Sequence, residues 1–138
     1  MDQAELVNFV RARGLGVIAS RGPDGSPQAA LIGIAATDQG ELVFDCSRGS
    51  RKYANIERHR AVALVVGWDD EVTVQIEGAA EVLAGADLDR CKTAYFEQYP
   101  DGRQRAESLE IAHIRVTPRW LRYSDYRPDT FSSSETDL

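Results

Sequence analysis

The sequence is poor in the residues from which metal sites and disulfide frameworks are built. Among its 138 residues it has two cysteines, Cys46 and Cys91, and two histidines, His59 and His113. No CxxC or HxxxH spacing occurs, so we expect no metal site, no disulfide framework and reduced thiols. Neither histidine has a nearby serine, cysteine or carboxylate pattern typical of a nucleophilic triad. We therefore interpret both histidines as structural residues.

Long apolar runs and a net positive charge are also missing. No apolar stretch approaches the roughly 20 residues that cross a bilayer, and the N-terminus lacks the basic and apolar regions of a signal peptide. These absences predict a cytoplasmic protein without a membrane partner. The formal net charge is -6 and the pI is about 4.9, which argues against nucleic acid as a partner.

The remaining composition is ordinary for a globular protein, with 43% hydrophobic and 28% charged residues. A chain of this length can bury roughly two thirds of its unfolded surface, so it needs no covalent staples. We expect one domain over residues 1–126. The last twelve residues, 127–138, read RPDTFSSSETDL and predict a polar, mobile tail.

Turn signals divide this domain into short strands joined mostly by short connections. Helices are expected to begin near Asp2, Ser50 and Asp87, and strands are expected at residues 15–20, 27–36, 42–44, 61–66, 71–83 and 111–123. The turns at residues 22–25 and 38–40 are too short for crossover helices, so the first three strands are expected to form an antiparallel meander. The last strand, with Pro118 and an Arg/Trp/Arg pattern, is typical of a half-exposed edge.

A basic segment joins two of these strands. Within thirteen residues the chain places five cationic side chains, at Arg48, Arg51, Lys52, Arg58 and Arg60. Ser50 is a suitable N-cap, so hydroxyls, backbone N–H groups and cations gather at the positive end of a helix, where an anion is stabilised. The segment is therefore either a phosphate-binding loop or a solvated charged surface kept for solubility.

Residues 41–68, with the triplet Ser50-Arg51-Lys52, resemble the flavin-binding segment of the pyridoxamine 5'-phosphate oxidase family. In that segment a strand is followed by a Ser-Arg-Lys triplet, a short helix and an apolar strand. The resemblance continues in order from about Leu15 to Tyr126, through PQAALIGI, VTVQIEGAAEV and the pair Tyr95-Phe96. It implies a mainly β fold, a split β-barrel of about six antiparallel strands with peripheral helices. It also implies FMN as the cofactor, in a groove between the subunits of a homodimer.

The resemblance also implies a set of cofactor contacts in this chain: Gln28, Ala29, Ala30, Leu31, Cys46, Ser47, Ser50, Arg51, Lys52, Thr73, Gln75, Trp120 and Arg122. Gln28 and Gly33 stand where the family has a phosphate-contacting Arg and a Lys. Because of these two departures, binding of the phosphate is expected to depend more on the triplet Ser50-Arg51-Lys52.

Several of these positions keep two interpretations. Cys46 stands in place of a Thr that touches the cofactor, but it also fits a small buried residue at a strand end. Either Thr73 or Gln75, two residues apart on one strand face, could reach the flavin ring, or both form a polar outer face. Trp120 is a packing or interface residue that could also face the partner's flavin.

The C-terminal part departs from true pyridoxamine 5'-phosphate oxidases. Those enzymes carry a Trp and an Arg-Leu-His-Asp-Arg signature that binds the substrate, whereas this chain has Tyr123-Ser124-Asp125-Tyr126-Arg127. We therefore expect an FMN-dependent oxidoreductase acting on another small molecule. Because the flavin carries the redox chemistry, no catalytic residue is assigned. The alternatives are an F420-dependent reductase of the same fold and a non-catalytic flavin- or haem-binding protein, for which two histidines are a small supply of ligands.

Overall fold

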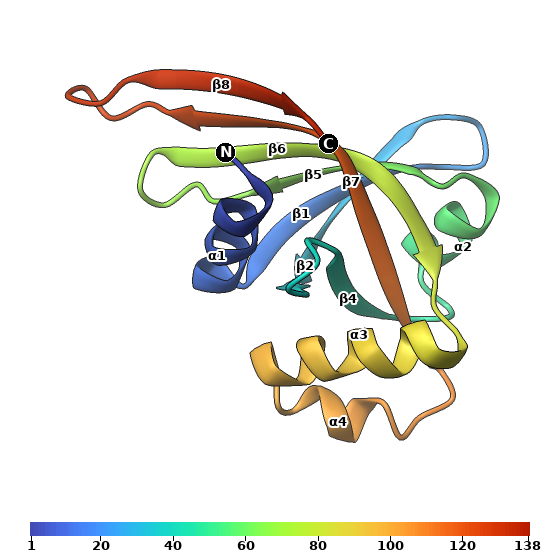
Figure 1. Cartoon of the computed structure of the whole chain (residues 1–138). Coiled ribbons are helices and arrows are strands. Elements are labelled where there is room, and N and C mark those ends of the chain that lie inside the picture. The colour runs from blue at the N-terminus through green and yellow to red at the C-terminus, as the bar shows by residue number, and fades with distance from the viewer.

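The computed structural model describes residues 1–138. Its strands are β1 (Leu15–Arg21), β2 (Pro27–Gly33), β3 (Ala35–Ala36), β4 (Leu42–Ser47), β5 (Ala61–Val66), β6 (Val72–Val82), β7 (Ile111–Asp125) and β8 (Ser132–Asp137). The helices are α1 (Gln3–Arg13), α2 (Arg51–Arg58), α3 (Gly85–Gln98) and α4 (Gly102–Arg105). One antiparallel sheet, in the order β2-β1-β5-β6-β7-β4-β3 with β8 added beside β7, curls into a half-barrel (Figure 1). The prediction of a mainly β, split-barrel fold is confirmed.

Helix α1 begins where the sequence predicts, after Asp2. The Asp2 side chain accepts a hydrogen bond from the Glu5 backbone N–H, and the Glu5 side chain accepts one from the Asp2 backbone, which completes a capping box. Gly14 ends the helix with φ 70°, a left-handed conformation that favours glycine. None of the four helices has the length and apolar content that crossing a membrane requires.

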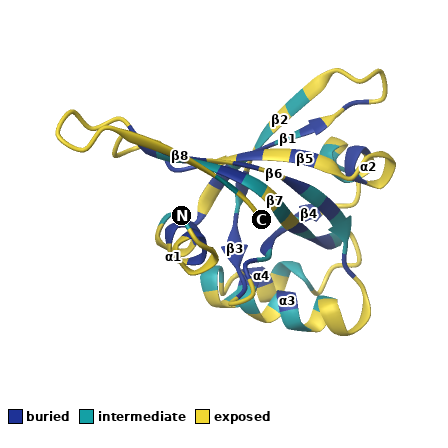
Figure 2. Ribbon diagram, turned by 45° about the horizontal axis from the view of Figure 1, so that its top comes forward, coloured by how far each residue is buried: buried dark blue, intermediate teal, exposed yellow.

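The alternating strands bury the faces that their sequences predict. Val72, Val74 and Ile76 of β6 point into the core, while the side chains between them are half-buried or exposed. The core is a single cluster of 27 buried residues enclosed by the curved sheet, α1 and α3. Figure 2 shows this burial on the inner strands, while the outward sides of the helices and the two long hairpins are exposed.

The predicted meander of the first three strands is confirmed with one change. The predicted strand 27–36 is interrupted at Ile34, so its first part, β2, pairs with β1 and its last part, β3, pairs with β4. At the interruption the Ile34 backbone N–H donates to the Gly14 carbonyl, and Ile34, Ala35 and Ala36 belong to the core. Strand β1 also pairs with β5, and β4 also pairs with β7, which the sequence did not predict.

The prediction that β7 is an edge strand is also wrong. This strand pairs with β6 on one side, and with β4 and then β8 on the other. Pairing with β4 ends at Val116 and pairing with β8 begins at Trp120, so Pro118, which has no N–H, lies where that side is unpaired. Arg119 of β7 has no partner on β6, and this shift of register brings Gly78 opposite Pro118. A Cβ on Gly78 would lie 2.5 Å from the Thr117 carbonyl oxygen.

The chain after Arg127 forms part of the sheet, contrary to the expectation of a mobile tail. Residues Ser132–Asp137 pair with Trp120–Asp125 and extend a long hairpin away from the barrel (Figure 1). The side chains of β8 are polar because they are exposed, but backbone hydrogen bonds do not depend on side-chain polarity. Composition alone therefore gave no signal for this strand.

Candidate functional site

The loop before α2 is shaped by its own serine side chains. The Ser50 hydroxyl donates to the Ser47 carbonyl at 2.7 Å and accepts from the Tyr53 N–H at 3.3 Å, while the Ser47 hydroxyl accepts from the Gly49 N–H at 3.1 Å. Ser50 is thus the N-cap that the sequence predicts. The next N–H groups, of Arg51 and Lys52, have no partner within the helix and mark its positive end.

A cavity of about 220 Å³ lies between this helix end and the strands β1 and β2. Five of the predicted contact residues line it, together with Ile18 and Ser20: Gln28, Ala29, Ala30, Arg51 and Lys52. Arg51 is exposed, Lys52 is half-buried, and neither takes part in any ion pair of the structure. The cavity therefore has two free cationic groups beside a helix N-terminus, which is an arrangement that binds anions.

Two other members of the basic cluster have separate contacts. Arg48 donates to the Tyr53 hydroxyl at 2.9 Å and to the Leu109 carbonyl at 3.1 Å, so it fixes the loop against the segment before β7. Arg58 donates to the Asn55 side-chain oxygen at 2.6 Å. Two functional groups were missed by sequence reasoning, the buried side chains of Ser20 and Asn55. The only signal for Asn55 was a polar residue beside Ile56 on the buried face of the helix.

Cys46 does not line this cavity. Its side chain belongs to the core cluster, and burial raises the pKa of its thiol above the usual value, so the thiol stays protonated. Gly33 lies outside the cavity as well, because the Tyr99 ring occupies the space beside it, 3.0 Å from where a Cβ would be.

The remaining predicted contacts lie on the outer face of the sheet. Gln75 and Trp120 line a separate cavity of about 190 Å³ with small and apolar residues of β1 and β5. Arg122 is opposite Gln75 but its guanidinium binds Glu135 of β8, and Thr73 donates to the Val66 carbonyl. Apart from Cys46, which is in the core, the predicted residues of one chain therefore form two groups, one around the anion cavity and its loop and one on this outer face.

The outer face has an exposed apolar row. Leu31, Val17 and Val65 are neighbours across β2, β1 and β5, and the row continues to Gln75 of β6. The Leu31 side chain is 63% exposed and Val65 is 38% exposed. Large apolar side chains of this kind, gathered in one row, are typical of surfaces that contact another molecule.

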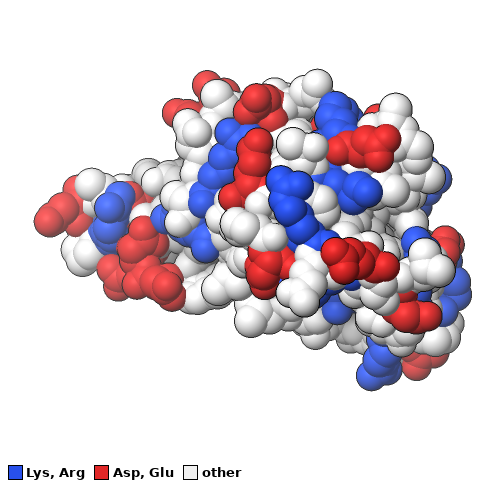
Figure 3. All heavy atoms as spheres, turned by 90° about the horizontal axis from the view of Figure 1, so that it is seen from below, with Lys and Arg blue, Asp and Glu red and all other residues white.

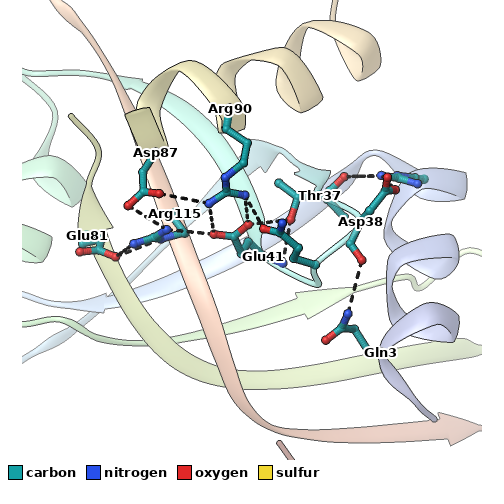
Figure 4. A network of polar contacts seen from close by, with 11 residues as sticks. Gln3, Thr37, Asp38, Glu41, Glu81, Asp87, Arg90 and Arg115 are labelled. Carbon is teal, nitrogen blue, oxygen red and sulfur yellow. Dashed lines mark hydrogen bonds and ion pairs between the residues drawn. The ribbon is translucent and has the colours of Figure 1, made fainter. Parts of the chain in front are cut away.

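Several other charged groups of the protein form a network of ion pairs. Glu41, the residue before β4, accepts from Arg90 and Arg115, which also bind Asp87 and Glu81. The network thus joins α3 to the start of β4 and to β6 and β7 (Figure 4). The face seen from below α3 likewise interleaves both signs of charge (Figure 3). Cations without an ion-pair partner also occur elsewhere, since Arg21 and Arg119 line another cavity, but the cavity beside α2 combines two of them with a helix N-terminus.

A family model and several known proteins match this chain. The family model described as pyridoxamine 5'-phosphate oxidase matches residues 2–125. The chain belongs to the pyridoxamine 5'-phosphate oxidase family. Pyridoxine/pyridoxamine 5'-phosphate oxidase from Rubrobacter xylanophilus is 35% identical over 89 residues, which are 64% of this chain and 39% of that protein. The enzyme of the same name from Thermosynechococcus vestitus is 36% identical over 86 residues, 62% of this chain and 39% of its own length. The match thus spans well under half of these curated relatives.

Solved structures of this fold are also similar to the chain. A heme binding protein from Mycobacterium smegmatis has a TM-score of 0.83 at 16% identity, over 99% of this chain and 58% of that one. General Stress Protein 26 from Bacillus anthracis has a TM-score of 0.75 at 19% identity, over the full length of both. A conserved hypothetical protein from Mycobacterium tuberculosis is 26% identical over 92% of this chain and 86% of that one, with a TM-score of 0.76. This likeness shows the shared split-barrel fold.

Proposed function

We propose that the protein is a homodimeric FMN-binding oxidoreductase that acts on a small molecule other than pyridoxamine 5'-phosphate. The observation that carries this proposal is the cavity in which Arg51 and Lys52 meet the N-terminus of α2 without any ion-pair partner. The phosphate of FMN is a monoester with about two negative charges near neutral pH, and these groups offer charge-assisted hydrogen bonds to it. When bound, FMN supplies the redox chemistry through its ring, and the protein supplies binding and orientation.

The residues of the cavity fit a phosphate in chemistry as well as in charge. Arg51 and Lys52 provide cations, Ser20 provides a hydroxyl and Gln28 an amide, and no carboxylate lines the cavity. A carboxylate there would repel the anion. Ile18, Ala29 and Ala30 form the rest of the wall, and the small alanine side chains let the backbone of β2 approach the ligand closely.

The flavin ring is proposed to lie between two subunits. Gln75, Trp120 and the apolar row on the outer face lie apart from the phosphate group of residues within one chain. An isologous dimer pairs the same patch on both copies, so it can cover Leu31 and Val65 and bring the outer face of one copy toward the cavity of the other. Homodimerisation thus gives both groups of residues a role in one site.

The substrate is proposed to differ from that of the named enzymes because the C-terminal side chains are committed elsewhere. Asp125 is buried and accepts hydrogen bonds from the backbone and the guanidinium of Arg127, at 3.0 and 2.7 Å. Thr130 donates to the same carboxylate at 2.8 Å. These contacts form the turn that leads into β8, so Arg127 is held in a turn and is not free to bind a substrate.

A haem-binding role is the second candidate, because the similar structure from Mycobacterium smegmatis is named a heme binding protein. The histidines do not favour it in this chain. His113 is buried between Tyr95 and Phe96, and His59 is at the C-terminal end of α2. F420 is a third candidate, since its phosphodiester would also need cationic groups.

An absorption spectrum of the protein, taken after titration with each cofactor, tests the three proposals. Bands of oxidised flavin on addition of FMN, with quenching of FMN fluorescence, are the expected result. A single deazaflavin band retained only with F420 would favour that cofactor, and a Soret band with haem would favour the second candidate. A protein that takes up none of them would contradict the proposed function.

A further inference from the structure

The wall of the anion cavity contains a hydrogen-bonded group formed by Ser20, Gln28 and Asn55. Asn55, on α2, is only 2% exposed, and Ser20 is buried as well. The Asn55 amide nitrogen donates to the Ser20 hydroxyl at 3.0 Å and to the Gln28 side-chain oxygen at 2.8 Å. Both amide protons of Asn55 are therefore used inside the wall, and Gln28 connects this buried group to the cavity.

Arg58 sets the direction of these hydrogen bonds. A guanidinium only donates, so the Asn55 oxygen must face Arg58, at 2.6 Å, and the Asn55 NH₂ group must face Gln28. Gln28 in turn must direct its oxygen toward Asn55 and its own NH₂ group away from it. That NH₂ group has no hydrogen-bond partner in the chain. It is not fully buried, because the only fully buried side-chain nitrogen or oxygen without a partner is His113 Nε2. The Gln28 nitrogen lies beside Gly22 of the β1–β2 hairpin, and its two N–H donors have no acceptor within the chain.

We propose that Asn55 is a positioning residue that holds Gln28 with its N–H donors toward the phosphate, so that a neutral amide replaces the family's Arg at this position. The inference rests on the proposed function, because it concerns selection of the phosphate at the same site. A free glutamine can turn either its oxygen or its NH₂ group toward an anion, and only the second is attractive. By fixing the amide, Asn55 removes the repulsive orientation without adding a charge.

In the resulting site the two cations, Arg51 and Lys52, match the charge of a phosphate monoester. Gln28 adds hydrogen bonds of fixed direction without adding a charge. A purely structural role for Asn55 makes a different prediction. If it only fastened α2 to β1 and β2, its loss would weaken binding of a flavin with and without phosphate to the same extent.

The test compares dissociation constants for FMN and riboflavin, followed by fluorescence quenching, in a small set of variants. Gln28→Ala should raise the FMN dissociation constant about 10-fold, the lower end expected for a hydrogen bond to a charged group. Asn55→Ala should raise it about 3- to 10-fold, because Gln28 then samples both orientations. Riboflavin binding should change less than about 2-fold in both. The double variant should bind FMN no more weakly than Gln28→Ala alone, since Asn55 acts through Gln28.

Two further variants keep the test decisive. Ile56→Ala removes a buried contact of the same helix but leaves the polar group intact, so it controls for loosening of α2 and should keep the preference for FMN. Asn55→Asp keeps the size of the side chain and its hydrogen bond with Arg58, so it replaces Asn55→Ala in the test if that variant does not fold. Its carboxylate accepts from Gln28 and turns the amide oxygen toward the cavity, and it should weaken FMN at least as much as Asn55→Ala.

The outcomes separate this inference from the function on which it rests. A wild-type protein that binds FMN no better than riboflavin removes the phosphate site and the role of Asn55 with it. A wild type that prefers FMN, with the same preference in Asn55→Ala or Asn55→Asp, overturns the role of Asn55 alone. Additive losses in the double variant, or equal loss of both ligands, would also overturn it.

Discussion

At the scale of single residues, the two free cations of the anion cavity carry most of the functional argument. Arg51→Ala or Lys52→Ala should each raise the FMN dissociation constant roughly 10- to 150-fold, because a hydrogen bond to a charged group contributes about 1.5 to 3 kcal/mol. Titration followed by fluorescence quenching measures this change. Riboflavin, which lacks the phosphate, should bind the wild type and both variants about equally. Unchanged FMN affinity in a folded double variant would contradict the assignment.

His113 predicts a pH dependence of stability that is separate from the flavin site. Burial lowers the pKa of this imidazole, with Asp45 opposing the shift and Lys92 and Arg105 adding to it. The folded state thus favours neutral His113, whereas the unfolded chain takes up a proton below its pKa of about 6.5. The free energy of unfolding therefore falls as the pH drops below that value. Replacement by Phe, in His113→Phe, should flatten the acid side of the profile.

The change is measured by urea denaturation at several pH values. One proton taken up on unfolding gives a slope of at most about 1.4 kcal/mol per pH unit, and this part of the slope should disappear in His113→Phe. The ion pairs, including those of Arg115, are the same in both proteins, so their effects on the pH dependence cancel in the comparison. Identical pH profiles would show that His113 does not take up a proton on unfolding.

At the scale of elements, the network around Glu41 fastens α3 to the sheet (Figure 4). The Glu41 side chain is 13% exposed, and hydrogen bonds from Arg90 are the main cause that lowers its pKa to about 2. Glu41→Gln should lower the free energy of unfolding by about 2 kcal/mol near neutral pH, because Arg90 and Arg115 lose a shared carboxylate. This stability is present above the unfolded pKa of about 4.5 and fades as the pH falls toward 2.

Asp38→Asn is the matched control for this network. Asp38 also pairs with an arginine, Arg11, but its side chain is 92% exposed. An exposed pair contributes little, so this variant should change the free energy of unfolding by less than about 0.5 kcal/mol. Chemical denaturation of both variants in parallel gives the comparison. Equal losses would show that burial of Glu41 is not what makes its pairs stabilising.

At the scale of the whole molecule, the apolar row on the outer face predicts self-association. Sedimentation equilibrium at micromolar concentration should give twice the mass of the 15.2 kDa chain. Leu31→Asp should shift the equilibrium to monomer and weaken FMN binding, since it places a charge in the proposed interface. Leu109→Asp is the control, because Leu109 is 91% exposed but lies in the loop before β7, away from the row. A wild-type monomer would contradict the proposed dimer.

Short-range features of the sequence determined much of this protein. The N-caps at Asp2 and Ser50, the turn after Arg21 and the alternation in β6 depend on residues close together in the chain, and each was predictable. The resemblance to the family rested on the triplet at residues 50–52, and five of the thirteen predicted contacts do line one cavity. The order of strands was not predictable in this way, because antiparallel pairing between β4 and β7 joins segments about 70 residues apart.

The tertiary structure alone decided which polar side chains have partners. The five cations of the basic run are equivalent in the sequence. In the structure Arg48 meets Leu109 and Tyr53, and Arg58 meets Asn55, while the other three have no side-chain partner. Asn55 meets Ser20 and Gln28 because α2 packs on the β1–β2 hairpin, which brings together residues 35 and 27 positions apart. Hydrogen bonds depend on distances of about 3 Å and on direction, and those are fixed only when distant segments pack against each other.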